Sequence, residues 1–466
     1  MDEEIDTHRK ALRINLDPRW YGTFAEIGAG QEVVRWFFRV GGGAGTISKS
    51  ISAYDMQVSD AIYGQTRRYV CRERLQSMLD YEHRLNLERL SDARGDTTMF
   101  FAFADTVSAR SFKGGNECHG WMGVKFQARS RDEDSQILIH VRMLDNDAAL
   151  QQEALGIVGV NLLYGAFFLH HEPELLIESL LHELSSNRIE IDLIEFSGIE
   201  FRQVDNRLMS LKLVEVGLSD AAMISADGTV LQPSEVLHKK AILVERGSFR
   251  PVCHANIDML RCAREKFSEH YGFAEGEVVE LMELTMRNLM AGGGIDRRDF
   301  LARAEVMSAL GMTVLISNYA RYYRLAAYLS QFTTNQVALV MGAASLTELF
   351  DYKYYTNLQG GILESFGRLF KNDLKLYVYP LKDRTTGTLT TVENLQVAPE
   401  LRKLYGFLVD RGDIAGLDNY DEAALDIFSR DVLAKIKEGD GSWETMVPPK
   451  VAEAIKRRRF FGYRPA

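Results

Sequence analysis

The stretch Thr-Val-Leu-Ile-Ser-Asn at residues 313–318 decides how the second half of the chain folds. A short apolar run between helical stretches is typical of a strand that is buried on both faces. Similar runs recur at residues 189–196, 221–225, 242–245, 336–341 and 374–379. Because helical stretches separate most of these runs, we expect an α/β fold here, with a mostly parallel sheet flanked by helices.

The first part of the chain shows another pattern. Helical spacing of apolar residues predicts helices at residues 31–40, from about 48, and at 67–90, 148–170 and 173–185. Runs rich in β-forming residues at 97–107, 123–128 and 136–143 indicate neighbouring antiparallel strands. We therefore predict an N-terminal α+β domain, residues 1–185, and an α/β domain with a C-terminal helical tail, residues 186–466.

The composition is that of a globular protein with about two domains. Of the 466 residues, 46% are hydrophobic and 26% are charged, and the net charge of -10 argues against a nucleic-acid partner. The four cysteines are too few and too scattered for a secreted disulfide scaffold. The acidic N-terminus lacks the pattern of an export signal, and the longest apolar stretch, residues 154–169, is too short to span a bilayer. We expect a cytoplasmic protein without a membrane partner.

A glycine-rich stretch, Gly-Gly-Gly-Ala-Gly-Thr-Ile-Ser-Lys-Ser at residues 41–50, is the most suggestive local motif. Its order resembles that of a phosphate loop, with a serine in place of the second glycine. In such a loop, backbone amides surround the phosphate, the lysine contacts it, and the hydroxyl holds Mg²⁺. The motif predicts nucleotide binding with Mg²⁺ at Gly43, Gly45, Lys49 and Ser50. The alternative is a glycine-rich connection between two helices, in which Lys49 is solvated.

A second motif, Ser-Ala-Asp-Gly-Thr at residues 225–229, follows a strand-like run. Together with residues 313–318 it resembles the first two motifs of haloacid dehalogenase-type phosphatases. The resemblance implies an HAD-like sheet and makes Asp227 a candidate metal ligand. Ser225, however, stands where that family has its nucleophilic carboxylate, and a serine cannot form the acyl-phosphate. The alternative is a β-hairpin, because Asp227-Gly228 between short strands is a strong turn signal.

Polar residues also follow two of the predicted strands. Ser317 and Asn318 come at the end of one strand, and Gly342 follows the run at residues 336–341. Ligands of open parallel sheets bind beyond the carboxyl ends of the strands. We therefore expect Ser317, Asn318 and Gly342 to line a ligand cleft.

Residues 21–32, 41–60, 151–164 and 360–380 resemble a sparsely characterised bacterial family labelled nicotinate-nucleotide adenylyltransferase, and the resemblance extends over most of the chain. It implies a nucleotide ligand, nucleotidyl transfer and a link to NAD metabolism. Enzymes of that class carry Gly-x-Phe-x-Pro-x-His-x-Gly-His, whose histidines stabilise the charge of the transferring phosphoryl group. We take residues 22–30 as the nearest run, and they have neither the proline nor the histidines. Their second motif, Ile-Ser-Ser-Thr-x-x-Arg, is matched at two positions within residues 316–322.

Taken together, the sequence predicts a protein that binds a phosphorylated small molecule or nucleotide, with nucleotidyl or phosphoryl transfer as its candidate reaction. We also expect a homo-oligomer. The alternative is a self-associating scaffold, without enzymatic activity, that is built on a degenerate HAD-like frame.

Overall fold

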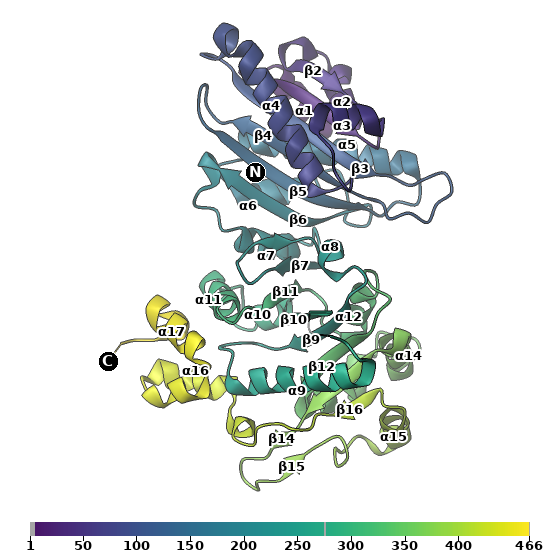
Figure 1. Ribbon diagram of the computed structural model, residues 1–466, viewed down its shortest axis with the longest axis vertical. Coiled ribbons are helices and arrows are strands. Elements are labelled where there is room, and N and C mark those ends of the chain that lie inside the picture. Colours follow the sequence, from purple (N-terminus) through teal and green to yellow (C-terminus); the bar gives the residue numbers. More distant parts are fainter. Residues whose placement is uncertain (1–4, 275, 466) are drawn as a thin grey trace. The chain divides into compact units, whose positions relative to one another are not determined.

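The computed structural model describes residues 5–274 and 276–465, which fold into two compact units (Figure 1). The first unit is Met1–Ala222 and the second is Met223–Ala466. The division lies later in the chain than the expected boundary at residue 186. The reason is that the strand at Ile189–Gly198 pairs with Asp134–Met143 and so belongs to the first unit.

The first unit is built on a six-stranded mixed sheet. Its strands, in sheet order, are β2 (Ile47–Ile51), β1 (Trp20–Ile27), β3 (Met99–Ser108), β4 (His119–Gln127), β5 (Asp134–Met143) and β6 (Ile189–Gly198). The pairs β3–β4 and β4–β5 are antiparallel, which confirms the pattern expected from the sequence. The strand β6 was expected in the mostly parallel sheet, but it pairs antiparallel with β5. The strand β1 runs parallel to both β2 and β3, so the sheet is mixed.

Helices cover both faces of this sheet. They are α1 (Thr7–Asn15), α2 (Glu32–Val40), α3 (Met56–Tyr63), α4 (Arg72–Arg94), α5 (Ala148–Phe168), α6 (Pro173–Ser179) and α7 (Asn206–Glu215). One face forms the main core with α1, α2, α5, α6 and α7, and α4 packs against the other through Leu75, Met78 and Leu79.

The helix α5 is buried along nearly its whole length, as the sequence predicts. Its glycines allow α2 to approach closely, because a Cβ at Gly159 would lie 2.3 Å from the Val33 side chain. The predicted helix near residue 48 is wrong, since those residues form β2. A β-branched isoleucine at each end of that strand, paired against β1, prevails over helical spacing there.

The second unit contains an eight-stranded sheet flanked by helices. Its strands, in sheet order, are β16 (Ile414–Gly416), β13 (Lys375–Tyr379), β12 (Val337–Gly342), β9 (Ala241–Arg246), β10 (Val278–Thr285), β11 (Thr313–Ser317), β7 (Ala221–Ile224) and β8 (Val230–Leu231). The strands from β16 to β11 all run parallel, which confirms the predicted α/β fold.

The strand β9 lies in the middle of the parallel sheet. From β9 the chain adds β10 and β11 on one side, and it then returns to add β12, β13 and β16 on the other. The order of the sheet therefore reverses between β9 and β12. In open α/β sheets such a reversal leaves a crevice beyond the carboxyl ends of the two strands.

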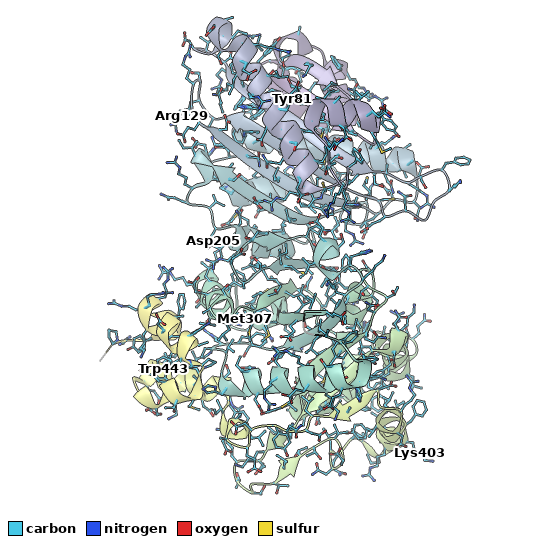
Figure 2. All side chains as sticks on the ribbon, viewed as in Figure 1. Tyr81, Arg129, Asp205, Met307, Lys403 and Trp443 are labelled. Carbon is cyan, nitrogen blue, oxygen red and sulfur yellow. The ribbon has the colours of Figure 1, made fainter. Side chains whose placement is uncertain are left out.

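The helices of the second unit are α8 (Pro233–Leu237), α9 (His254–Tyr271), α10 (Met286–Leu289), α11 (Arg297–Ser308), α12 (Tyr322–Leu329), α13 (Ala343–Leu349), α14 (Gly361–Leu369), α15 (Arg402–Asp410), α16 (Ser429–Glu438) and α17 (Pro449–Arg458). A small hairpin joins β14 (Leu381–Lys382) to β15 (Leu389–Thr390). In the helical tail, α17 packs on α11, and Met307 and Trp443, both labelled in Figure 2, are buried. No helix within the described ranges is both long and apolar enough to cross a bilayer.

Candidate functional site

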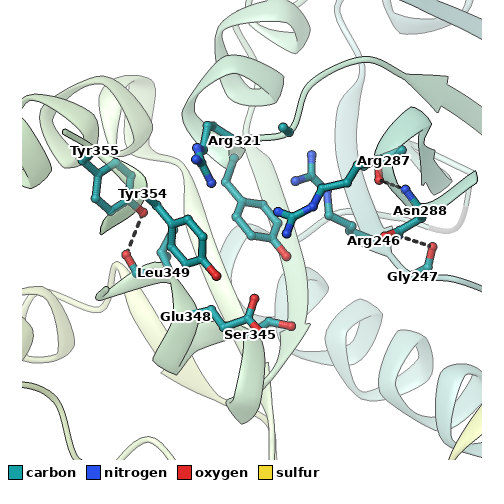
Figure 3. Close-up of a pocket in the computed structure, with 13 residues that line it drawn as sticks. Arg246, Gly247, Arg287, Asn288, Arg321, Ser345, Glu348, Leu349, Tyr354 and Tyr355 are labelled. Atoms are coloured by element: carbon teal, nitrogen blue, oxygen red, sulfur yellow. Dashed lines mark hydrogen bonds between the residues drawn. The ribbon is translucent and has the colours of Figure 1, made fainter. Parts of the chain in front are cut away.

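A pocket of about 360 Å³ lies at the carboxyl ends of the central strands of the second unit (Figure 3). Arg246 and Gly247 come from the end of β9, and Thr285 from the end of β10. Further lining residues follow β11 and β12, so four neighbouring strands contribute to one site. This is the position at which the reversal of strand order predicts a ligand crevice.

Arg246 is the fixed cation of the pocket. Its guanidinium donates two hydrogen bonds to the Glu283 carboxylate, of 2.7 and 2.8 Å, and a third of 2.9 Å to the carbonyl oxygen of Tyr319. It also lies 4.2 Å from the centre of the Tyr322 ring. Burial lowers the pKa of Arg246, but the adjacent Glu283 charge outweighs it and the pKa is raised. Arg246 is therefore a rigid, permanently charged wall of the pocket.

Two more arginines reach the same pocket without a carboxylate partner. Among the described residues, neither Arg287 nor Arg321 forms an ion pair. Arg321 lies over the Tyr354 ring, 4.7 Å from its centre. Figure 3 shows the side chains of Arg246 and Arg287 near each other, while that of Arg321 lies on the side of Tyr354, and all three line the same pocket. Like charges that line one pocket repel one another, so this lining is suited to an anion that neutralises them.

Aromatic and polar side chains complete the lining. Tyr322, Tyr354 and Tyr355 supply ring surfaces, and α13 contributes Ser345 and Glu348. Arginine and tyrosine together recognise a ligand that carries both an anionic group and a flat ring, since guanidinium binds phosphate and the ring stacks on tyrosine.

A second hollow of about 390 Å³ adjoins the first. The two share Thr285, Arg287 and Ala320, and Asn318 and Met290 line the second. Arg287 therefore borders both hollows, and each has a volume in the range of small-molecule ligand pockets.

The loop that connects β9 to α9 is held rigidly beside the pocket. A Cβ on Gly247 would lie 2.7 Å from the Phe249 ring, so the close approach requires glycine. The side chain of Phe249 is buried, and Arg250 forms an ion pair of 2.5 Å with Asp299. Ser429, the first residue of α16, accepts a 3.3 Å hydrogen bond from the Arg250 amide and donates one of 2.9 Å to the Pro251 carbonyl.

This loop carries the signal that the sequence analysis missed. Residues 247–256 read Gly-Ser-Phe-Arg-Pro-Val-Cys-His-Ala-Asn, which matches the glycine, phenylalanine and proline of the adenylyltransferase signature in their correct spacing. Choosing residues 22–30 as the nearest run was therefore a mistake: that run lies in the first unit, on β1 and the turn after it. The run at 247–256 lies between the central strand and a helix, as a phosphate-binding turn requires.

The two histidine positions of the signature hold Cys253 and Asn256 instead. The Asn256 side-chain oxygen accepts hydrogen bonds from the Cys253 amide, at 3.1 Å, and from its thiol, at 3.2 Å. The Asn256 amide group donates to Glu245 at 2.8 Å. Burial raises the pKa of the Cys253 thiol to about 11 and that of Glu245 to about 8. Both groups are therefore uncharged near neutral pH and cannot replace the imidazoles as stabilisers of phosphoryl charge.

The strand-end residues predicted from the sequence, Ser317, Asn318 and Gly342, all lie in this region, but only one of them lines a hollow. Asn318 lines the second hollow. Ser317 is buried and donates a 2.5 Å hydrogen bond to Glu283, so it supports the carboxylate that holds Arg246. Gly342 is the last residue of β12 and the N-cap of α13, and it does not itself line the pocket in the described structure.

The glycine-rich stretch at residues 41–50 belongs to the first unit, whereas these strand ends belong to the second. Gly43 and Gly45 form a short 3₁₀ turn between α2 and β2, so the order is helix, turn, strand, the reverse of a phosphate loop. Lys49 forms an ion pair with the buried Glu82, and Ser50 accepts a 3.0 Å hydrogen bond from Gln31. Phosphate binding at this turn stays a prediction, and these contacts do not favour it.

Asp227 lies in the turn of a hairpin. The strands β7 and β8 pair antiparallel on either side of it, which confirms the hairpin alternative. The Asp227 carboxylate accepts hydrogen bonds from the Ser225 hydroxyl and the Thr229 amide, and these bonds lower its pKa. Within residues 5–274 and 276–465 no group of three histidine, cysteine or acidic side chains is placed to hold a metal ion.

Comparison with known proteins adds little. No family model and no curated protein sequence matches the chain. Among solved structures, it is similar to the competence/damage inducible protein CihA from Agrobacterium tumefaciens, at 17% identity over 34% of this chain and 94% of that one, with a TM-score of 0.25. It is also similar to the competence damage-inducible protein A (ComA) from Klebsiella pneumoniae, at 15% identity over 36% and 99% of the two chains, with a TM-score of 0.27. Similarity of this size assigns no function.

Proposed function

We propose that the second unit binds a phosphorylated small molecule of nucleotide size in the arginine-lined pocket. The observation that carries the proposal is that Arg287 and Arg321, which have no carboxylate partner among the described residues, line the same pocket as the fixed Arg246. The phosphate groups would contact these guanidinium groups, and the ring would stack on Tyr322 or Tyr354. The polar lining favours ligand binding over the scaffold alternative, because a scaffold has no need of a charged pocket at the strand ends.

Nucleotidyl or phosphoryl transfer is the candidate reaction of this site. With Cys253 and Asn256 at the histidine positions, stabilisation of the transferring charge would fall to the three arginines. Mg²⁺ binds in such sites through one or two carboxylates together with the phosphates of the ligand. The link to NAD metabolism rests on the family resemblance of the sequence.

Isothermal titration calorimetry of the full chain tests the proposal. The ligands are AMP, ATP, nicotinic acid mononucleotide, NAD and inorganic phosphate, each with and without Mg²⁺. We expect at least one nucleotide to bind, and Arg287→Ala and Arg321→Ala each to weaken it about tenfold or more, because each variant removes charge-assisted hydrogen bonds.

Arg324→Ala is the matched control, because Arg324 is exposed on the same helix as Tyr322 but does not line the pocket. Lys49→Ala separates this site from the glycine-rich turn of the first unit, and we expect it to leave binding unchanged. The proposal fails if no nucleotide binds, or if the Arg287 and Arg321 variants bind as tightly as the Arg324 variant.

A further inference from the structure

The lining of the pocket is not uniformly positive. Glu348 lies near the end of α13, and Ser345 precedes it by about one helical turn, so both side chains face the pocket from the same helix. Figure 3 shows the two side chains together, apart from the guanidinium group of Arg287. The pocket thus has an arginine side and a carboxylate side.

Glu348 forms no ion pair with any described residue, although three arginines line the same pocket. The Tyr322 ring, which Arg246 contacts at 4.2 Å from its centre, lines the same pocket as Glu348. An exposed carboxylate that lines the pocket and forms no ion pair with its arginines has its oxygen atoms available to donors on a ligand.

A ligand that satisfies both sides must carry hydrogen-bond donors at a distance from its phosphate. The neighbouring 2′- and 3′-hydroxyls of a ribose fit this requirement, because one carboxylate can accept a hydrogen bond from each hydroxyl. The same carboxylate repels a phosphate placed on either hydroxyl, so it excludes ligands as well as selecting them.

We infer that Glu348 is a specificity-determining residue, which selects nucleotides with a free ribose diol over 2′-deoxynucleotides and over nucleotides phosphorylated on the 2′-hydroxyl. This inference rests on the proposed function, because it concerns the same pocket. It assigns to Glu348 a part in choosing the ligand that is separate from the anchoring of the phosphate by the arginines.

The experiment measures dissociation constants of the full chain for AMP, GMP, CMP and UMP, for their 2′-deoxy counterparts, and for adenosine 2′,5′-bisphosphate. For the wild type we expect each ribonucleotide that binds to bind about tenfold or more tightly than its 2′-deoxy counterpart, because a hydrogen bond to a charged acceptor is lost. Glu348→Ala is expected to bring that ratio to about one while phosphate anchoring by Arg321 persists.

Glu348→Lys gives a result that misfolding cannot imitate. A cation at this position is expected to make adenosine 2′,5′-bisphosphate bind more tightly than AMP, the reverse of the wild-type order. Glu438→Ala is the matched control, since Glu438 is exposed on α16 and is not a pocket residue.

The outcomes separate the two proposals. Equal affinity of the wild type for ribo- and deoxyribonucleotides, or an unchanged ratio in Glu348→Ala, overturns the assignment of Glu348 and leaves the proposed function standing. Failure of every nucleotide to bind overturns the proposed function and this inference with it.

Discussion

Replacing the buried Glu245 by glutamine is expected to make the chain more stable, by an amount that depends on pH. Glu245 lies on β9 with none of its surface exposed, and one of its carboxylate oxygens has no hydrogen-bond partner among the described residues. Burial raises its pKa from 4.5 to about 8. Between these two pH values the folded chain keeps a proton that the unfolded chain has released.

The sign and size of the effect follow from that difference. Because unfolding releases the proton, the free energy of unfolding of the wild type falls as the pH rises from 4.5 to about 8, and it is constant above that. At about 1.4 kcal/mol for each unit of pKa, the full loss is about 4 to 5 kcal/mol. Glutamine has the same shape and does not titrate, so the free energy of unfolding of Glu245→Gln does not fall in this way as the pH rises.

Calorimetric unfolding of wild type and Glu245→Gln at a series of pH values measures the difference. We expect it to be small near the lower end of the window and to grow steadily to its full size near the upper end. The exposed Glu438→Gln is the control and should follow the wild type throughout. A difference between wild type and Glu245→Gln that does not change with pH would refute the reasoning, because it would show that the buried group is charged or that it titrates normally.

Three further outcomes are expected. Glu283→Ala should destabilise the second unit by about 3 to 5 kcal/mol in urea titration, because it leaves the buried Arg246 charge unpaired, and a loss below about 1 kcal/mol would contradict a tight pair. Gly22→Ala should destabilise the first unit, since its Cβ would lie 2.1 Å from the Phe101 carbonyl oxygen. Gly367→Ala, which has open space around it in α14, should instead stabilise the second unit by about 0.5 to 1 kcal/mol. Equal unfolding midpoints for the two variants would argue against the packing at Gly22. Iodoacetamide should label Cys253 far more slowly than the partly exposed Cys118, because the Cys253 thiol is buried and its pKa is about 11, and mass spectrometry of labelled peptides would reveal the opposite order.

The strands that the sequence predicts are those whose residues are apolar and buried and have no further role. The runs that became β11 and β12 are continuous and apolar, because both faces of the parallel sheet are covered. The strand β10 was not predicted, since Glu283 interrupts its apolar pattern, and that glutamate is needed to hold Arg246. The strand β1 was missed for a similar reason: its Glu26 accepts hydrogen bonds of 2.9 Å from the Val33 and Val34 amides at the start of α2.

The position of the candidate site could be predicted from the sequence, but the residues that line it could not. Placing ligands beyond the strand ends requires only the expectation of a parallel sheet. Naming Arg287, Arg321 and Glu348 requires the order of the strands, because these residues come from separate connections that meet only after the sheet has formed. The spacing of glycine, phenylalanine and proline at residues 247–251 was the one local signal that could have pointed to the correct connection.

The hydrogen bonds between Ser429 and the loop after β9 have a consequence for synthesis of the chain. The loop leaves the ribosome long before its partner, because Pro251 and Ser429 are separated by 178 residues. At translation rates of roughly 5 to 20 residues per second, Ser429 is synthesised about 10 to 35 seconds after the loop with which it forms hydrogen bonds. During that interval the growing polypeptide can already assemble the strands on one side of β9. The loop that borders the pocket is thus among the last parts of the second unit to receive all of its contacts, since it does so only when α16 has been made.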